Sequence, residues 1–286
     1  MAPGLQTPVA QRAARTVRVR VANPAAFQTW MRQYLPGGHV SQPSASTHTL
    51  AVAGLDATML AQLAACPLVE FVDVADRRAH EERQLNNSDL SVNAIATVHA
   101  RFPELAGQGL TVSVKELPFN PDDIDFKGRV LSAGTFPGPA STHATAMATL
   151  IGGAGNSHPL GRGVARQVKL ATSDFARLLP DDGQQLTQAG VSVQNHSYGV
   201  TIENYYGIES LEYDRQVRQF PTLLHVFSSG NVGTQASAAG PYTGLAAVAN
   251  VTGQFKMSKN TLSVGATDPS GQVAALARAG RRTTAA

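Results

Sequence analysis

The sequence predicts an α/β fold in which a doubly wound parallel sheet follows a small α+β domain. Two observations support this prediction. From residue 107 onward, short β-rich runs alternate with helical patterns, which is typical of parallel strands joined by crossover helices. Before that, residues 17–76 show the more compact order strand, helix, two strands, helix, strand, which is the split βαβ pattern. We therefore expect two structural units of different class.

The elements of the small domain follow from hydrophobic spacing and from chain breakers. Alternating apolar residues predict strands, with a weaker one second in order, over 16–21, 39–42, 47–54 and 68–76. Apolar residues near helical spacing predict helices over 25–35 and 56–66, which end at Pro36 and Pro67. We expect an unstructured tail over 1–16 and the small domain over 17–76.

The larger unit shows the alternation of a doubly wound sheet. Its apolar runs predict strands over 110–115, 167–173, 191–197, 222–229 and 261–267. Helical patterns follow His143 and recur near 184–189 and over 208–219. A charged, polar stretch over 77–89 is typical of a linker. We expect the linker to span 77–100 and this unit, incomplete at its C-terminus, to span 101–286.

Composition excludes several classes of protein. The chain has 286 residues, 43% of them hydrophobic, and a formal net charge of only +3 with scattered arginines, so we expect no nucleic-acid partner. No apolar run approaches the roughly 20 residues of a membrane span. The single cysteine, Cys66, forms no internal disulfide and is expected to pack, and no zinc motif is present. We expect a monomer without membrane contact.

Polar side chains gather where the predicted parallel strands end. Glu116 follows the first strand of the larger unit, Ser197 to Gly199 follow a later strand, and Asn231 follows the next. His143 begins a helix nearby in the order. Because the carboxyl ends of such strands share one edge of the sheet, a carboxylate, an imidazole and an amide are expected in one crevice. A histidine oriented by a carboxylate is a general base and an amide can stabilise an oxyanion, so the pattern indicates acyl transfer.

Five blocks of the sequence resemble the subtilisin-like serine peptidases, in the order of that family and over about 160 residues. They are LTVSVKE (110–116), HATAMATLIGG (143–153) with GRGVA (161–165) after it, VSVQNHSYG (191–199), LLHVFSSGN (223–231) and NTLSVGATD (260–268). Residues 17–76 resemble the inhibitory propeptide of the family. The resemblance implies a serine endopeptidase that hydrolyses peptide bonds through an acyl-enzyme.

The resemblance also implies roles for individual residues. His143 would be the general base, Asn231 the oxyanion donor, and Ser197, Tyr198 and Gly199 the strand that holds a peptide substrate. Glu116 stands where the family has aspartate, and its longer side chain can still orient the imidazole. The alternatives for this role are Asp122, Asp123 and Asp125. Ala146 replaces a second histidine of the motif.

We expect no cofactor. The acidic cluster formed by Asp122, Asp123 and Asp125 could be considered for calcium, but it lacks the closing glutamate of a calcium loop and is typical of a solvated turn. His196 and His225 show no metal spacing and are expected to pack within the sheet. The family resemblance implies secretion or a cell-envelope location, although no signal peptide is visible.

The Gly-Thr-Ser block that carries the family's nucleophile does not occur in this sequence, nor do other serine acyl-enzyme motifs. We therefore expect a chain truncated before that block, by an interrupted or frameshifted gene, with little or no peptidase activity. Two alternatives stay open. One is a non-catalytic peptide-binding pseudo-peptidase. The other is an unrelated small-molecule-binding doubly wound protein, in which Glu116, His143 and Asn231 would lie far apart.

Overall fold

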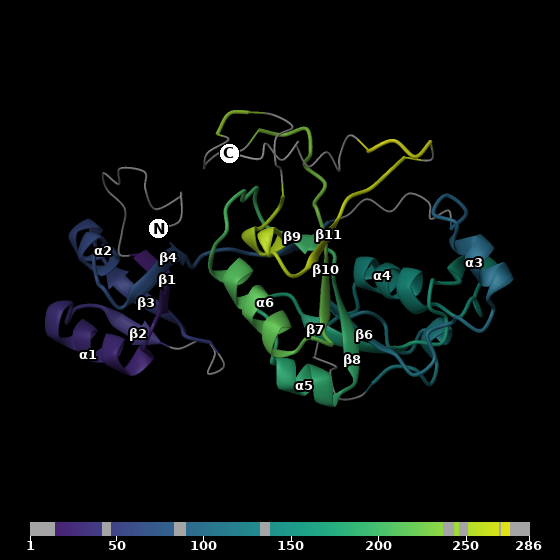
Figure 1. Cartoon of the computed structure of the whole chain (residues 1–286), viewed down its shortest axis with the longest axis horizontal. Coiled ribbons are helices and arrows are strands. Elements are labelled where there is room, and N and C mark those ends of the chain that lie inside the picture. Colours follow the sequence, from purple (N-terminus) through teal and green to yellow (C-terminus); the bar gives the residue numbers. More distant parts are fainter. Residues whose placement is uncertain are drawn as a thin grey trace.

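The computed structural model places two sheets in two bodies of the chain (Figure 1). The structure describes residues 15–41, 47–82, 90–131, 138–236, 243–245, 251–268 and 270–274. Residues 1–14 of the tail expected over 1–16, and all of residues 275–286, therefore lie outside the described residues. The smaller body carries the N-terminal strands, and the larger one carries the parallel sheet.

The N-terminal body contains the expected order of strands and helices. Its elements are β1 (Arg15–Val21), α1 (Pro24–Tyr34), β2 (His39–Ser41), β3 (Thr49–Leu55), α2 (Ala57–Ala64) and β4 (Val69–Val74). The strands form an antiparallel sheet in the order β2-β3-β1-β4. One face of β1, formed by Val17, Val19 and Val21, is fully buried against the helices, and Cys66 packs in the same core.

Local signals explain where the two N-terminal helices begin. The Asn23 side chain accepts the N–H of Ala26 at 3.1 Å, and Pro24 stands in the first turn, where its missing N–H costs nothing. Asp56 caps α2 in the same way by accepting the N–H of Met59 at 2.8 Å. Such caps satisfy backbone donors that have no partner inside the helix.

The C-terminal body contains the predicted doubly wound sheet. Its five strands are parallel, in the order β11-β10-β8-β6-β7, with bounds β6 (Thr111–Glu116), β7 (Lys169–Asp174), β8 (Val191–His196), β10 (Leu224–Ser228) and β11 (Leu262–Val264). Helix α4 (Thr142–Gly152) lies on one side of the sheet, and α5 (Gly183–Gln188) and α6 (Ile208–Gln219) lie on the other (Figure 1). Each predicted strand and helix of this unit is confirmed to within a few residues.

Helix α4 lies close against the sheet because its inward face is small. Ala144, Ala148 and Gly152 are buried. A Cβ added to Gly152 would lie 2.8 Å from Val168 Cγ1, which is closer than atoms pack, so glycine permits this approach. The Ser141 hydroxyl caps the helix by accepting the N–H groups of His143 and Ala144. The run of small residues thus fixes the distance of His143 from the strands.

Several short elements are additional to the predicted ones. Helix α3 (Ile95–Arg101) begins inside the expected linker and ends one residue beyond it, and strand β5 (His80–Glu81) pairs with β9 (Tyr198–Gly199) in the larger body. The 3₁₀ turns are η2 (Ile124–Phe126), η3 (Pro159–Gly161) and η4 (Gln254–Met257). The charged stretch before the larger unit is therefore partly ordered against that unit.

Candidate active site

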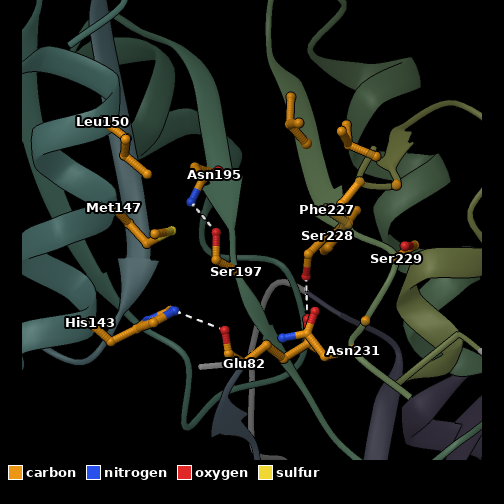
Figure 2. Close-up of a pocket in the computed structure, with 15 residues that line it drawn as sticks. Glu82, His143, Met147, Leu150, Asn195, Ser197, Phe227, Ser228, Ser229 and Asn231 are labelled. Atoms are coloured by element: carbon orange, nitrogen blue, oxygen red, sulfur yellow. Dashed lines mark hydrogen bonds between the residues drawn. The ribbon is translucent and has the colours of Figure 1, made fainter. Parts of the chain in front are cut away.

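The structure brings the three predicted catalytic residues to the carboxyl edge of the parallel sheet. Glu116 ends β6, His143 lies in the first turn of α4, and Asn231 follows β10. His143, Asn231 and Ser197 line one cavity of about 440 Å³, which Met147 and Leu150 of α4 also face (Figure 2). The predicted convergence of a carboxylate, an imidazole and an amide is therefore present in the structure.

Glu116 and His143 form a buried pair with loose geometry. His143 Nδ1 lies 3.7 Å from Glu116 Oε2, which is within ion-pair distance but too long for a hydrogen bond. Neither of these two atoms has a hydrogen-bond partner among the described residues. The other carboxylate oxygen accepts the N–H of Ser197 at 2.8 Å. That bond holds the carboxylate at Ser197, between β8 and β9, and leaves Oε2 directed at the imidazole.

Burial and charge shift both groups. Burial raises the pKa of the Glu116 carboxyl, and the neighbouring imidazole and the Ser197 N–H offset only part of that rise. Burial by itself lowers the pKa of His143, but the Glu116 carboxylate, with smaller contributions from Glu81 and the Glu82 carbonyl, outweighs this effect, so the pKa of the imidazole lies above its usual value. The carboxylate therefore favours a protonated ring, as expected of a group that stabilises an imidazolium.

Two of the alternative carboxylates, those of Asp123 and Asp125, have other partners. Asp125 accepts the N–H groups of Asn156 and Ser157 and the hydroxyl of Ser157, and Asp123 accepts the N–H of Asp125 at 2.9 Å. The Asp122 N–H is held by Asn120 at 3.1 Å. These contacts close a turn around η2, whereas Glu116 is the carboxylate that faces the ring of His143.

A segment of the same chain occupies the strand predicted to hold substrate. In the β5–β9 pairing His80 lies opposite Gly199 and Glu81 opposite Tyr198, and the Glu82 N–H donates to Ser197 O at 3.3 Å. The Tyr198 side chain points into a buried aromatic cluster, so its main chain makes this contact. Residues 197–199 thus bind an extended segment antiparallel through backbone groups.

The same segment reaches the catalytic histidine. His143 Nε2 lies 3.1 Å from the carbonyl oxygen of Glu82 (Figure 2). Because a carbonyl oxygen only accepts, Nε2 carries a proton in this contact. The Glu82 side chain turns the other way, toward Ser228 and Lys256. The expected linker therefore places its Glu82 carbonyl at the base.

Sequence reasoning did not identify Glu82 and Lys256 as site residues. Glu82 lies in a charged run, and Lys256 lies between the last predicted strands, where no periodic pattern distinguishes it. The two residues are 174 positions apart. What distinguishes Lys256 is that its side chain is buried, and the sequence does not show this.

Other buried polar groups have structural partners. Lys115 donates to Leu179 O at 2.7 Å and pairs with Asp181 at 3.1 Å. His196 and His225 contact each other at 3.0 Å inside the sheet, and His225 also contacts Gln216, which confirms that these histidines pack and hydrogen-bond internally. Burial lowers the pKa of both rings, so they stay neutral.

Within the described ranges, no group of three or more acidic, histidine or cysteine residues is placed to hold a metal ion. In those ranges, too, no helix has both the length and the apolar character needed to cross a membrane.

Comparisons with known proteins agree with this geometry. A model of the subtilase family matches residues 85–285. No curated protein matches the chain. Solved structures with the same fold include the following two. The epidermin leader peptide processing serine protease of Staphylococcus aureus has 13% identity and a TM-score of 0.59, over 93% of this chain and 72% of that one. Fervidolysin of Fervidobacterium pennivorans, a keratinolytic enzyme related to subtilisin, has 15% identity and a TM-score of 0.52, over 79% of this chain and 41% of that one.

Proposed function

Because this chain belongs to the subtilase family, whose members are serine proteases, we propose that Glu116, His143 and Asn231 are the catalytic groups of a serine-type endopeptidase site. The family membership overturns the alternative of an unrelated small-molecule-binding protein. The observation that supports the residue roles is the Glu116–His143 pair at 3.7 Å, on the edge of a cavity that Asn231 also lines. The substrates of the family are peptides or proteins.

The roles follow from the chemistry of each group. His143 takes a proton from the nucleophile and returns it to the leaving amine, and Glu116 holds the ring and stabilises its charged form. Asn231 donates its amide to the oxyanion of the tetrahedral intermediate. Ser197, Tyr198 and Gly199 hold the substrate as an added strand, which is the mode in which residues 80–82 already lie.

The N-terminal body fits the role of an inhibitory propeptide. It meets the larger body through buried ion pairs on and before α6. Arg20 pairs with Glu212 at 2.7 Å, and Arg18 pairs with Glu209. Arg77, the first residue after this body, reaches Glu203 at 2.7 Å and also Glu209. From there the chain leads directly to β5 in the site. Because the segment fills the substrate strand, it would exclude other peptides until it is released or cut.

The 286-residue chain by itself is proposed to have little or no peptidase activity. Its sequence contains no Gly-Thr-Ser block, and without a serine nucleophile the covalent route is closed even when base and oxyanion donor are in place. A peptide-binding role without cleavage is the second candidate, and the seated β5 strand favours it. Secretion or a cell-envelope location is proposed from the family alone.

An activity assay with a matched variant tests this proposal. The chain and its His143→Ala variant are incubated with a quenched fluorescent protein substrate, with and without a serine-directed phosphonate. We expect equal, background turnover from both chains. Turnover that depends on His143 and is stopped by the phosphonate would show that a serine of this chain acts as nucleophile, and would contradict the proposed inactivity while supporting the site.

A further inference from the structure

The Glu82 side chain occupies a buried pocket beside the candidate active site. Both of its carboxylate oxygens lie 3.1 Å from Lys256 Nζ, and the hydroxyls of Ser228 and Thr252 donate to the same carboxylate. Lys256 is fully buried and the Glu82 side chain is 5% exposed. Each oxygen of the carboxylate therefore has at least two donors, and the pocket is built of groups that recognise an anion.

The charge of the pocket selects what can fill it. Among the described residues, Glu82 is the carboxylate that lies within ion-pair distance of Lys256. Burial lowers the pKa of the Lys256 ammonium to about 8 even with that carboxylate nearby. A neutral or cationic side chain in the pocket would leave a buried ammonium without its counterion, which is strongly unfavourable.

Two glycines give the pocket its room. A Cβ added to Gly199 would collide with the Glu82 carboxylate, and one added to Gly230 would collide with the Thr252 hydroxyl. Gly230 also has φ +105°, a backbone conformation that other residues rarely adopt. The space beside β9 is therefore kept free for a side chain of the length of glutamate.

The backbone shows which position of a bound peptide this pocket reads. The residue whose side chain fills the pocket is the residue whose carbonyl oxygen lies 3.1 Å from His143 Nε2. Its N–H donates to Ser197, and the two preceding residues pair with β9. In a substrate bound the same way, the pocket would receive the side chain on the acyl side of the bond presented to the base.

We infer that this site selects peptides with an acidic residue, glutamate above all, on the acyl side of the bond presented to His143, and that Lys256 is the specificity-determining residue. This inference rests on the proposed function, because it takes residues 80–82 to lie as a substrate lies. Ser228 and Thr252 support Lys256 in holding the carboxylate. The same selection places the chain's own Glu82 in the site.

A peptide-binding experiment on the full chain tests the inference. The variant Glu82→Pro empties the pocket, removes the N–H by which residue 82 is held at Ser197, and leaves Lys256, Ser228 and Thr252 in place, so that β9 is free to pair with an added peptide. Fluorescent hexapeptides with the sequence of residues 77–82, blocked at both ends and ending in Glu, Gln, Leu or Lys, are titrated against it by anisotropy. We expect the Glu peptide to bind tightest, by on the order of tenfold or more over Gln and Leu, with Lys the weakest.

Further substitutions in the Glu82→Pro chain identify the residue responsible. Lys256→Met should remove the preference for Glu, and Lys256→Glu should shift it toward the Lys peptide. Lys259 is exposed and lies three positions after Lys256, so Lys259→Met should leave the order of the four peptides unchanged. Circular dichroism identifies any Lys256 variant that fails to fold. In that case the binding of the four peptides to the chain that keeps Lys256 still tests acidic selection.

The outcomes separate this inference from the proposed function. Equal binding of the four peptides would overturn acidic selection and leave the peptide-binding strand intact. Binding of none of them would contradict the peptide-binding strand itself, and the inference would fall with it.

Discussion

Two buried acid–base pairs lie near the carbonyl oxygen of Glu82, and they differ in how closely their charged atoms approach. At Glu116 and His143 the charged atoms are 3.7 Å apart, and neither has a hydrogen bond among the described residues. At Glu82 and Lys256 the contacts are 3.1 Å, and two hydroxyls complete them. The first pair therefore keeps buried polar atoms without a hydrogen-bond partner, whereas both carboxylate oxygens of the second are fully hydrogen-bonded.

The largest effect is expected from breaking the saturated pair. In Lys256→Met the Glu82 carboxylate would be buried without a cation, which destabilises the seated segment by about 3–5 kcal/mol. The pairing of two residues with β9 does not offset a cost of that size. We expect residues 80–82 to leave β9, so that hydrogen exchange at the Glu82 amide becomes fast. Lys259→Met is the control. Unchanged protection of that amide in Lys256→Met would show that Lys256 does not hold the segment.

A smaller effect is expected from removing one donor of the same pocket. Ser228→Ala deletes a hydrogen bond to a charged group, worth about 1.5–3 kcal/mol, while Lys256 and Thr252 remain. Exchange at the Glu82 amide should rise, but less than in Lys256→Met. The neighbouring Ser229→Ala is the matched control, since Glu82 accepts from Ser228 and not from Ser229 within the described contacts. An effect as large as that of Lys256→Met would mean that the hydroxyl, not the ammonium, dominates recognition.

The smallest effect on stability is expected at the loose pair. Glu116→Gln keeps an acceptor for the Ser197 N–H and removes a carboxylate whose ionisation burial already opposes. We expect the free energy of unfolding to change by less than about 1 kcal/mol. The pKa of His143, followed by NMR, should fall, because Glu116 is the largest of the groups that raise it and only the smaller contributions of Glu81 and the Glu82 carbonyl remain against burial. A His143 pKa that does not move would remove Glu116 from the role of orienting group.

The same pair predicts the direction of a pH dependence. Because the pKa of folded His143 is raised above its usual 6.5, its charged form stabilises the fold fully below pH 6.5. That contribution is lost as the pH rises through the folded pKa. Chemical unfolding of the wild type and of His143→Asn at several pH values measures it as the difference between the two. A difference that grows as the pH rises above 6.5 would contradict the prediction.

Much of the fold was predictable because it is encoded by local spacing. The alternation in residues 16–21 and the small residues after His143 specify elements whose buried faces do not depend on distant partners. Glu116 and Asn231 were found because both directly follow apolar strands, and parallel strands end at one edge. The 3.7 Å distance and its lack of hydrogen bonds were not predictable, since they depend on how closely α4 approaches β6.

By itself, the sequence determined the order of the main strands and helices, the two larger sheets that they form, and which residues stand at the strand ends. Tertiary structure alone decided that residues 80–82 lie along β9 and that Glu82 meets Lys256, 174 positions away. The physical reason is that hydrophobic periodicity acts within a few turns of chain. The sequence does not distinguish an exposed charged residue from one in a pocket, because the difference depends on whether the fold buries a counterion beside it.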